Sequence, residues 1–288
     1  MPVAPGELPY TEIAPPVDLA PYVDRLWLST TVGGEPGRIH HVLPDGCADV
    51  IVDVARGEAE LVGAMTRAIE IASAPAERVA VRFKPGTAAA VARCALAELT
   101  DRSVGLAELG LAGDLAGRIA DAGSRTPRPR LAASIPLGAT EHARLAVLVG
   151  WLRERLAGAR PPDPLTARAV ALLSTGAARV DDVADRLGVT RQYLARRFRG
   201  EVGLTPKQLA RIARMQRVAA AIGSRRAAPP DLARLAAELG YFDQSHLSHD
   251  LRDLIGLTPA AVVAERPIAL SHLFGEVPFL QSPPRRVA

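Results

Sequence analysis

The first third of the chain consists of short runs rich in apolar and β-branched residues, and turn residues separate these runs. Residues 25–32, 39–43 and 49–54 are such runs, and they end at Gly-Gly, Pro-Asp-Gly and Arg-Gly. Short runs at regular spacing predict β-strands in a small barrel or sandwich. A barrel of this size either encloses a small ligand or is filled by its own side chains.

After residue 85 the pattern changes to that of Ala- and Leu-rich helices. Residues 87–99 and 106–120 are candidate helices, and a longer helix is expected over about 140–156. Leucines in the long helix recur at spacings of three and four and predict one apolar stripe. The stripe is suited to pack either on its own domain or on a second copy of the chain, so homodimerisation is one of two alternatives. Its members are Leu145, Leu148, Leu152 and Leu156.

Pro-rich breaks at residues 124–130 and 159–164 divide the chain. The predicted fold class is α+β, a small β-barrel or sandwich with helices followed by an all-α domain. The C-terminal end lacks periodicity and is expected to be loosely ordered. The expected parts are a β-rich sensor domain with helices (1–124), a linker and helix suited to dimerisation (125–160), a helical domain (161–265) and a tail (266–288).

The helical domain contains one pattern twice. Residues 180–198 and 232–251 each show a helix, a Leu-Gly turn and a second helix, and Gly-Leu-Thr-Pro follows each copy. Gly188 suits the left-handed conformation that ends a helix, and Thr190 is placed to cap the next one. This is the pattern of a helix-turn-helix motif, whose second helix enters the major groove of DNA. A helical repeat with a solvated Arg surface is the structural alternative.

Side chains that point outward from each second helix are candidate DNA contacts. Leu194 and Phe198 are expected to pack inward, and the segment from Thr190 to Arg199 contains four Arg and no acidic residue. Such a surface suits phosphates and guanine edges. The second copy is less basic, so we expect it to bind more weakly or to read bases through Gln and His. The candidate contacts are Thr190, Arg191, Gln192, Arg196, Arg199, Gln244, Ser245, Ser248, His249 and Arg252.

Two further features favour DNA as the partner. The net charge of +4 is concentrated between Arg160 and Glu265, where 16 basic residues face 11 acidic ones. A basic excess of this kind is typical of a nucleic-acid-binding module. A helix expected over about 207–222 would hold the two copies at a fixed separation, so that they meet successive major grooves about 10–10.5 bp apart.

Several motifs of the helical domain match a known family. They are the two Leu-Gly turns, residues 190–198 and 245–248, and the two Gly-Leu-Thr-Pro segments. Through them, residues 166–264 resemble the DNA-binding domain of the AraC/XylS family of bacterial transcription regulators. The resemblance implies a monomeric seven-helix domain on an asymmetric site. It also implies base contacts by Gln192, Arg196, Gln244, Ser248 and His249.

The second copy departs from the family pattern. Leu247 and Leu251 stand where aromatic residues are common, and His249 stands where Arg is common. The N-terminal part, through residues 43–50 and 81–86, is similar to a domain that precedes this module in many such regulators. For that domain the resemblance implies sensing of a small molecule, dimerisation, or both. The implied partners are promoter DNA and a small-molecule effector, with RNA polymerase as a further candidate.

A chemical role for the N-terminal domain is the main alternative. His40, His41, Cys47 and Asp49 lie close in sequence and suggest a metal site or a redox or alkylation sensor. Against this, adjacent residues on a strand point to opposite faces, and a cysteine after an Asp-Gly turn fits as a small buried residue. A protein–protein adaptor that uses the leucine stripe is a further alternative.

The sequence gives no positive sign of catalysis, a cofactor or membrane insertion. It lacks a Gly-rich phosphate loop, a Gly-x-Ser-x-Gly elbow and a His-Glu-x-x-His motif. No stretch approaches the roughly 18 apolar residues of a membrane span, and the first residues do not resemble a secretory signal. Two cysteines, Cys47 and Cys94, rule out a disulfide framework and fit a reducing compartment. We therefore expect a cytoplasmic protein that is not an enzyme.

Overall fold

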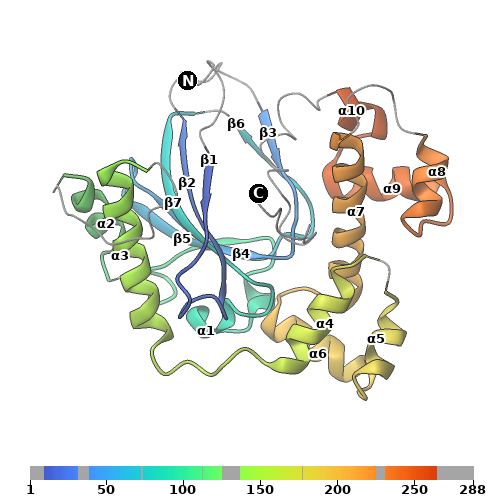
Figure 1. Cartoon of the computed structure of the whole chain (residues 1–288), viewed down its shortest axis with the longest axis horizontal. Coiled ribbons are helices and arrows are strands. Elements are labelled where there is room, and N and C mark those ends of the chain that lie inside the picture. Colours follow the sequence, from blue (N-terminus) through green and yellow to red (C-terminus); the bar gives the residue numbers. More distant parts are fainter. Residues whose placement is uncertain are drawn as a thin grey trace, which may run out of the picture.

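The computed structural model places a β-rich N-terminal domain beside a helical C-terminal domain (Figure 1). The predicted tail (266–288) and nearly all of the predicted break at 124–130 lie outside the residues that the structure describes. The described residues are 10–31, 39–72, 74–111, 113–124, 137–176, 178–224 and 231–264.

Six strands form one antiparallel sheet in the order β1-β2-β7-β4-β5-β8, and β3 pairs with β6 alone. Among the described strands, β1 and β8 lie at the two edges of the six-stranded sheet. The α+β class is therefore confirmed, and the sheet is open rather than closed into a barrel. The strands are β1 (Tyr10–Ile13), β2 (Val23–Thr31), β3 (Ile39–Val42), β4 (Ala48–Asp53), β5 (Glu58–Val62), β6 (Ile69–Ala72), β7 (Ala76–Phe83) and β8 (Ser103–Gly105).

The core of the N-terminal domain lies between one face of the sheet and two helices. Val50 and Val81 are paired across β4 and β7, and both are fully buried. Helices α2 (Leu115–Ser124) and α3 (Ala139–Leu156) cover this face (Figure 1). The predicted leucine stripe of α3 is buried here together with Trp151. The stripe thus packs within its own domain and is not presented to a second copy.

For two of the helices predicted after residue 85, the predicted bounds are wrong. The segment 87–99 contains only α1 (Ala89–Ala92) and the 3-10 turn η1 (Leu96–Glu98). Arg93 has a left-handed backbone with φ of 57°, which ends α1. The helix predicted at 106–120 begins at Leu115. Buried residues such as Leu96 and Leu111 pack these turns onto the core, and this packing overrides their helix propensity.

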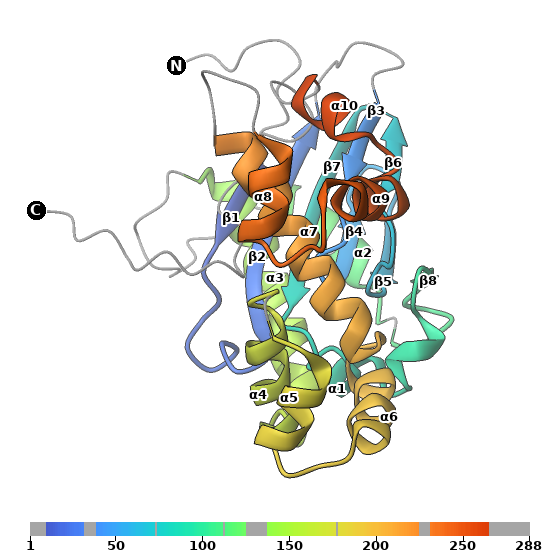
Figure 2. The ribbon, with the colours of Figure 1, turned by 90° about the vertical axis from the view of Figure 1, so that its right-hand side faces the viewer.

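Seven helices lie in the described part of the C-terminal domain. The connecting helix predicted at 207–222 is present as α7, and it runs between the two helix-turn-helix units (Figure 2). The helices are α4 (Pro164–Leu173), α5 (Val180–Arg186), α6 (Arg191–Glu201), α7 (Pro206–Ser224), α8 (Leu232–Glu238), α9 (Gln244–Ile255) and α10 (Pro259–Ala264).

The two domains share part of their packing. Leu43 of the N-terminal domain is buried in the core of the helical domain. Gly46, three residues later, has a φ of 78°, and a Cβ there would lie 2.5 Å from the Cδ1 of Leu209 on α7. Only glycine combines this backbone conformation with this close approach. The loop of residues 43–47 is therefore seated directly on α7.

Candidate nucleic-acid interface

The first helix-turn-helix unit, α5 and α6, has the local structure that its sequence predicts. Gly188 has a φ of 67°, so the chain leaves α5 through a left-handed residue. The Thr190 hydroxyl oxygen accepts a hydrogen bond of 3.2 Å from the backbone N–H of Tyr193 and caps α6. Leu194 and Phe198 are fully buried. The opposite side of α6 is left facing solvent.

The second unit, α8 and α9, has the same construction with a different cap. Gly240 takes the left-handed conformation, with a φ of 75°. The carboxylate of Asp243 accepts a hydrogen bond of 2.7 Å from the backbone N–H of His246. Leu247 and Leu251 are fully buried, so leucine fills the positions where the family often has aromatic residues. The Asp-Gln-Ser-His segment contains the signal for this cap, which was not predicted from the sequence.

The structure places all ten predicted contact residues at the surface. In α9, Ser248 is half-buried, and the other nine predicted residues of the two units are exposed. Figure 2 shows α6 and α9 one above the other on the same side of α7. The two faces are thus presented together, and which bases they contact stays a prediction.

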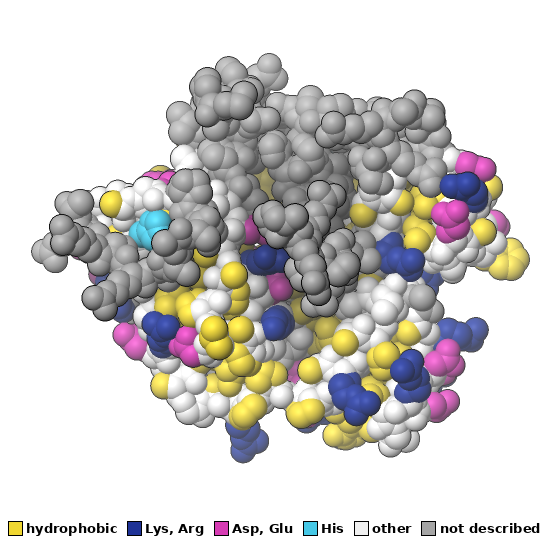
Figure 3. Space-filling model, viewed as in Figure 1, with side chains coloured by type: hydrophobic (Ala, Val, Ile, Leu, Met, Phe, Trp, Pro, Cys, Tyr) yellow, Lys and Arg dark blue, Asp and Glu magenta, His cyan; other side chains and the backbone are white. Residues whose placement is uncertain are grey.

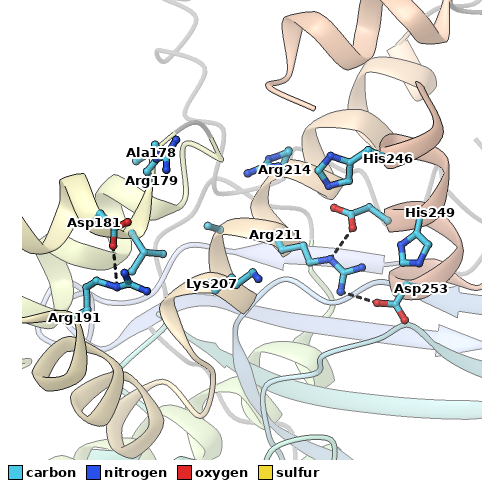
Figure 4. Close-up of a pocket in the computed structure, with 13 residues that line it drawn as sticks. Ala178, Arg179, Asp181, Arg191, Lys207, Arg211, Arg214, His246, His249 and Asp253 are labelled. Carbon is cyan, nitrogen blue, oxygen red and sulfur yellow. Dashed lines mark hydrogen bonds and ion pairs between the residues drawn. The ribbon is translucent and has the colours of Figure 1, made fainter. Parts of the chain in front are cut away.

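A hollow of about 820 Å³ lies between the two units. Its floor is α7, and Figure 4 shows Arg191 at one wall and His246 and His249 at the other. The hollow therefore brings together residues of both predicted contact surfaces. It is lined by Ala178, Arg179, Val180, Asp181, Arg191, Lys207, Ala210, Arg211, Arg214, His246, His249, Asp250 and Asp253.

One arginine of the floor anchors α9. The Arg211 guanidinium lies 2.7 Å from Asp250 and 2.6 Å from Asp253 (Figure 4). Asp250 is buried, and the hydrogen bond from Arg211 lowers the pKa of Asp253. Both carboxylates belong to α9, so Arg211 holds this helix against α7.

A second arginine of α7 links the second unit to the segment that follows α4. The Arg214 guanidinium stacks over the ring of Tyr241, with 5.1 Å between its central carbon and the ring centre. It also donates a hydrogen bond of 3.3 Å to the backbone oxygen of Gly176, which follows α4. Arg214 is therefore engaged in packing within the protein.

Other cationic side chains in the hollow are better placed than Arg211 and Arg214 to bind an anion from outside the protein. Arg191 pairs with Asp181 at 2.8 Å, and both side chains are open to solvent. Lys207 and Arg179 are exposed and have no ion-pair partner among the described residues. Arg179 and the α7 cations were not predicted from the sequence. The signal for the latter was the spacing of Lys207, Arg211 and Arg214 by four and three residues, which puts them on one helical face.

Aromatic side chains near the recognition helices were also missed. Arg196 lies over the ring of Tyr193 at 5.7 Å, and the Tyr193 ring is exposed. Phe242, immediately before the cap of α9, is 93% exposed. An aromatic ring so open to water at the start of a recognition helix is available for contact with a partner. Figure 3 shows basic side chains spread over this helical half of the molecule, with acidic ones among them.

The alternative site in the N-terminal domain does not have the features of a reactive centre. Cys47 is buried, and this burial raises the pKa of its thiol well above the usual value, which disfavours the nucleophilic thiolate. His41 is buried beside Glu70, 3.9 Å away, whereas the side chain of His40 lies outside the described residues. Among the described residues, no three His, Cys, Asp or Glu side chains cluster as metal ligands.

The N-terminal domain does contain a group of partly buried charged residues. Burial raises the pKa of Asp49 to about 6, although the Arg82 guanidinium lies 3.5 Å from its carboxylate. The Asp49 carboxylate also accepts a hydrogen bond of 2.8 Å from the indole N–H of Trp27. Arg82 is 3.4 Å from Asp45, in the loop seated on α7. The group forms a polar network inside the domain.

Comparison with protein families agrees with the geometry of the helical domain. The family described as a helix-turn-helix domain matches residues 183–265, which begin within α5 and include the rest of both units. These residues are an AraC-type helix-turn-helix domain, and the chain is a DNA-binding transcription regulator. In the N-terminal domain of this regulator, residues 11–105 match a domain of unknown function, DUF6597. No curated protein matches the chain.

Solved structures with similarity to this regulator share little sequence with it. The C-terminal domain of AraT, a response regulator from Geobacillus stearothermophilus, is 22% identical, with a TM-score of 0.33, over 36% of this chain and 87% of that one. ToxT from Vibrio cholerae is 10% identical, with a TM-score of 0.37, over 90% and 97%. ToxT in an unsaturated fatty acid-bound form is 12% identical, with a TM-score of 0.37, over 89% and 94%.

The described helices of this regulator include none with both the length and the apolar character that crossing a membrane requires.

Proposed function

We propose that this regulator binds an asymmetric promoter site with α6 and α9 in successive major grooves, about 10–10.5 bp apart. The observation that carries the proposal is the shared hollow, because residues of both recognition helices line it from opposite walls. One duplex lying across the hollow would meet both helices at once. In α6, Gln192 and Arg196 would read bases, and in α9, Gln244, Ser248 and His249 would do so.

The cations of the hollow have a separate role in this proposal. Between two successive major grooves the protein faces the DNA backbone, which offers phosphates and little sequence information. Lys207 and Arg179 are exposed at this place, and Arg191 can exchange Asp181 for a phosphate because both side chains are solvated. Arg199 and Arg252 lie on the exposed helix surfaces and would flank these contacts. Together they would provide binding that depends strongly on salt.

The two units contribute unequally in this proposal. The exposed side of α6 carries Arg196 and Arg199, whereas α9 offers His249 at its centre and has Asp253 near its end. A guanidinium makes a stronger contact with a guanine edge or a phosphate than an imidazole does, because it is always charged and presents a fork of donors. The first unit would therefore provide most of the affinity, and the second would add specificity through Gln244.

The N-terminal domain, residues 1–124, is assigned the role of sensor. Its support is position, because the 43–47 loop is buried against α7 and joined to the polar network around Arg82. A small molecule or another signal that changes this network would act on the helix that separates the recognition helices. The proposal gives the chain no catalytic step.

The test is genome-fragment selection with the full-length protein, followed by footprinting and a salt titration. One enriched motif with two protected segments a helical turn apart is the expected result. A matched control is Arg186→Ala, because Arg186 is exposed at the end of α5 but does not line the hollow. It should leave the footprint unchanged, whereas Lys207→Ala should weaken it. Weak binding without a motif, with and without cell extract as a source of effector, would contradict the proposal.

A further inference from the structure

One loop of the N-terminal domain touches the end of the second recognition helix. This loop, residues 63–68, connects β5 to β6. The Arg67 guanidinium pairs with Asp253 of α9 at 2.9 Å, and the backbone N–H of Ala68 donates a hydrogen bond of 2.7 Å to the oxygen of Leu254. Asp253 is also held by Arg211, so the loop joins the same ion-pair network that fixes α9 on α7.

A second loop touches the end of the first recognition helix. This loop, residues 96–102, comprises η1 and the residues before β8. The Thr100 hydroxyl donates a hydrogen bond of 2.5 Å to the oxygen of Gly203, two residues after the end of α6. A Cβ on Gly203 would lie 3.0 Å from the oxygen of Leu96, and Gly203 has a φ of 84°. The backbone of the first unit is therefore in direct contact with this loop.

Asp101 ties the two loops together. Its carboxylate accepts hydrogen bonds of 2.6 Å from both the backbone N–H and the hydroxyl of Thr66. The backbone N–H of Gly63 donates to the oxygen of Arg102 at 2.9 Å. A Cβ on Gly63 would lie 1.9 Å from the oxygen of Leu99, so the loops touch backbone to backbone. One connected part of the N-terminal domain thus contacts the ends of both recognition helices.

We propose that these two loops, tied by Asp101, form a brace that sets the spacing of α6 and α9 and so the spacing of the DNA half-sites. The inference rests on the proposed function, in which both helices enter one duplex. Asp101 is a positioning residue, since it acts through the loops and not on DNA. The contacts lie at the C-terminal ends of α6 and α9 and leave their N-terminal ends, which read bases in helix-turn-helix proteins, open.

The brace adds a constraint that α7 alone does not supply. A helix of 19 residues is about 28 Å long, and helices of this length bend gently. The two units are attached to opposite ends of α7, so a small bend changes both their distance and their relative direction. The two loops connect the end of α6 to the end of α9, and this second connection between the units resists bending of α7.

The test uses the full-length protein and the site obtained by selection. Three duplexes carry the half-sites at natural spacing, or with one base pair added or removed, which turns one half-site by roughly 34°. The variant is Asp101→Gly. Asp101 has a φ of 57°, so glycine keeps the left-handed backbone accessible while the carboxylate is lost. The control is Asp114→Gly, the same change at another aspartate with positive φ, at the start of α2.

The wild type and Asp114→Gly should prefer natural spacing strongly. In Asp101→Gly this preference should shrink by about fivefold, the size typical of coupling within one network. Thr100→Val, which removes the hydroxyl that bonds to Gly203, should change the preference in the same direction. These variants keep all proposed DNA contacts, so a shift in the spacing profile reports positioning alone.

Three outcomes would overturn the brace. They are equal binding of all three duplexes by the wild type, an unchanged spacing preference in both variants, and a loss of affinity that is uniform across spacings. Uniform loss would mean that the two loops stabilise the protein without setting the spacing of α6 and α9. In each case the wild type still gives a sequence-specific footprint. Absence of any such footprint would instead contradict the proposed function.

Discussion

The Gln216 side-chain amide donates a hydrogen bond of 2.8 Å to the backbone oxygen of Pro44, and both residues are buried. Gln216 lies on α7, 172 residues away in the chain. A buried amide must find its partner inside the protein, so this bond fixes the 43–47 loop on the connecting helix. The same loop contains Asp45, which faces Arg82 inside the N-terminal domain. A physical connection therefore runs from the interior of that domain to the helix between the recognition helices.

Arg196→Ala should remove one base contact. The exposed guanidinium points away from the buried side of α6, and a bidentate contact with a guanine is worth about 1–3 kcal/mol of discrimination. We expect a loss of that size on the selected site and a relaxed preference at one base pair. Binding to a randomised library at each position of the site measures both.

Arg199→Ala is the matched control for that measurement, because Arg199 is an exposed arginine on the same helix with a proposed phosphate role. It should weaken selected and random DNA alike and reduce the salt slope by about 1. If Arg196→Ala also weakens binding to selected and random DNA alike, the predicted base contact of Arg196 is wrong.

The recognition elements were predictable because their signals are local. Gly188 and Gly240 follow a leucine in each copy, and the inward positions Leu194 and Phe198 are four residues apart. A turn, a cap and a spacing of four residues are properties of one short segment. The strand runs were recognisable for the same reason, since each is a short β-like run bounded by turn residues.

The other parts of the site and of the fold depend on contacts between residues that lie far apart in the sequence. Arg211 and Asp250 are 39 residues apart, and in the sequence alone Arg211 is one more arginine of a basic helix. In the structure its charge is taken up by α9, whereas Lys207 on the same face stays available. The helix predicted over 87–99 failed for a similar reason, because burial of Leu96 and Leu99 in the core of the N-terminal domain decides the local backbone.

Asp181→Asn should strengthen DNA binding. Asp181 pairs with Arg191 at 2.8 Å at the wall of the hollow, where it competes with a phosphate. A solvated ion pair is worth about 0–1 kcal/mol, so we expect a gain of up to about fivefold on selected and random DNA. The gain should shrink as salt rises, because solvated charges are screened. Asp185→Asn, on the same helix but outside the hollow, should have a smaller effect. A larger gain for Asp185→Asn would argue against competition at Arg191.

Arg211→Ala should destabilise the second unit. It leaves the buried carboxylate of Asp250 without its cation, and an unpaired buried polar group costs about 1–3 kcal/mol. Chemical denaturation should show this loss, and hydrogen exchange should place it in α9. Arg234→Ala breaks an exposed i,i+4 pair with Glu238 in the same unit, and it should cost about 0.5 kcal/mol or less. The double variant Arg211→Met with Asp250→Leu should recover much of the loss. Equal effects of the two single variants would contradict the anchoring role.

Asp49→Asn should stabilise the protein at pH 7 and lose this advantage in mild acid. Burial raises the pKa of Asp49 to about 6, whereas the carboxyl is acidic when the chain is unfolded. Between pH 4 and 6 the folded wild type therefore holds a proton that the unfolded chain has released, and the wild type loses stability as the pH rises through this window. The variant does not titrate and still offers Trp27 an amide oxygen. The difference in unfolding free energy should thus grow with pH by up to about 1.4 kcal/mol per unit and level off above pH 6. Denaturation of both proteins from pH 4.5 to 7.5 measures it. A difference that is constant, or that grows toward acid, would mean that Arg82 outweighs the burial of this carboxylate.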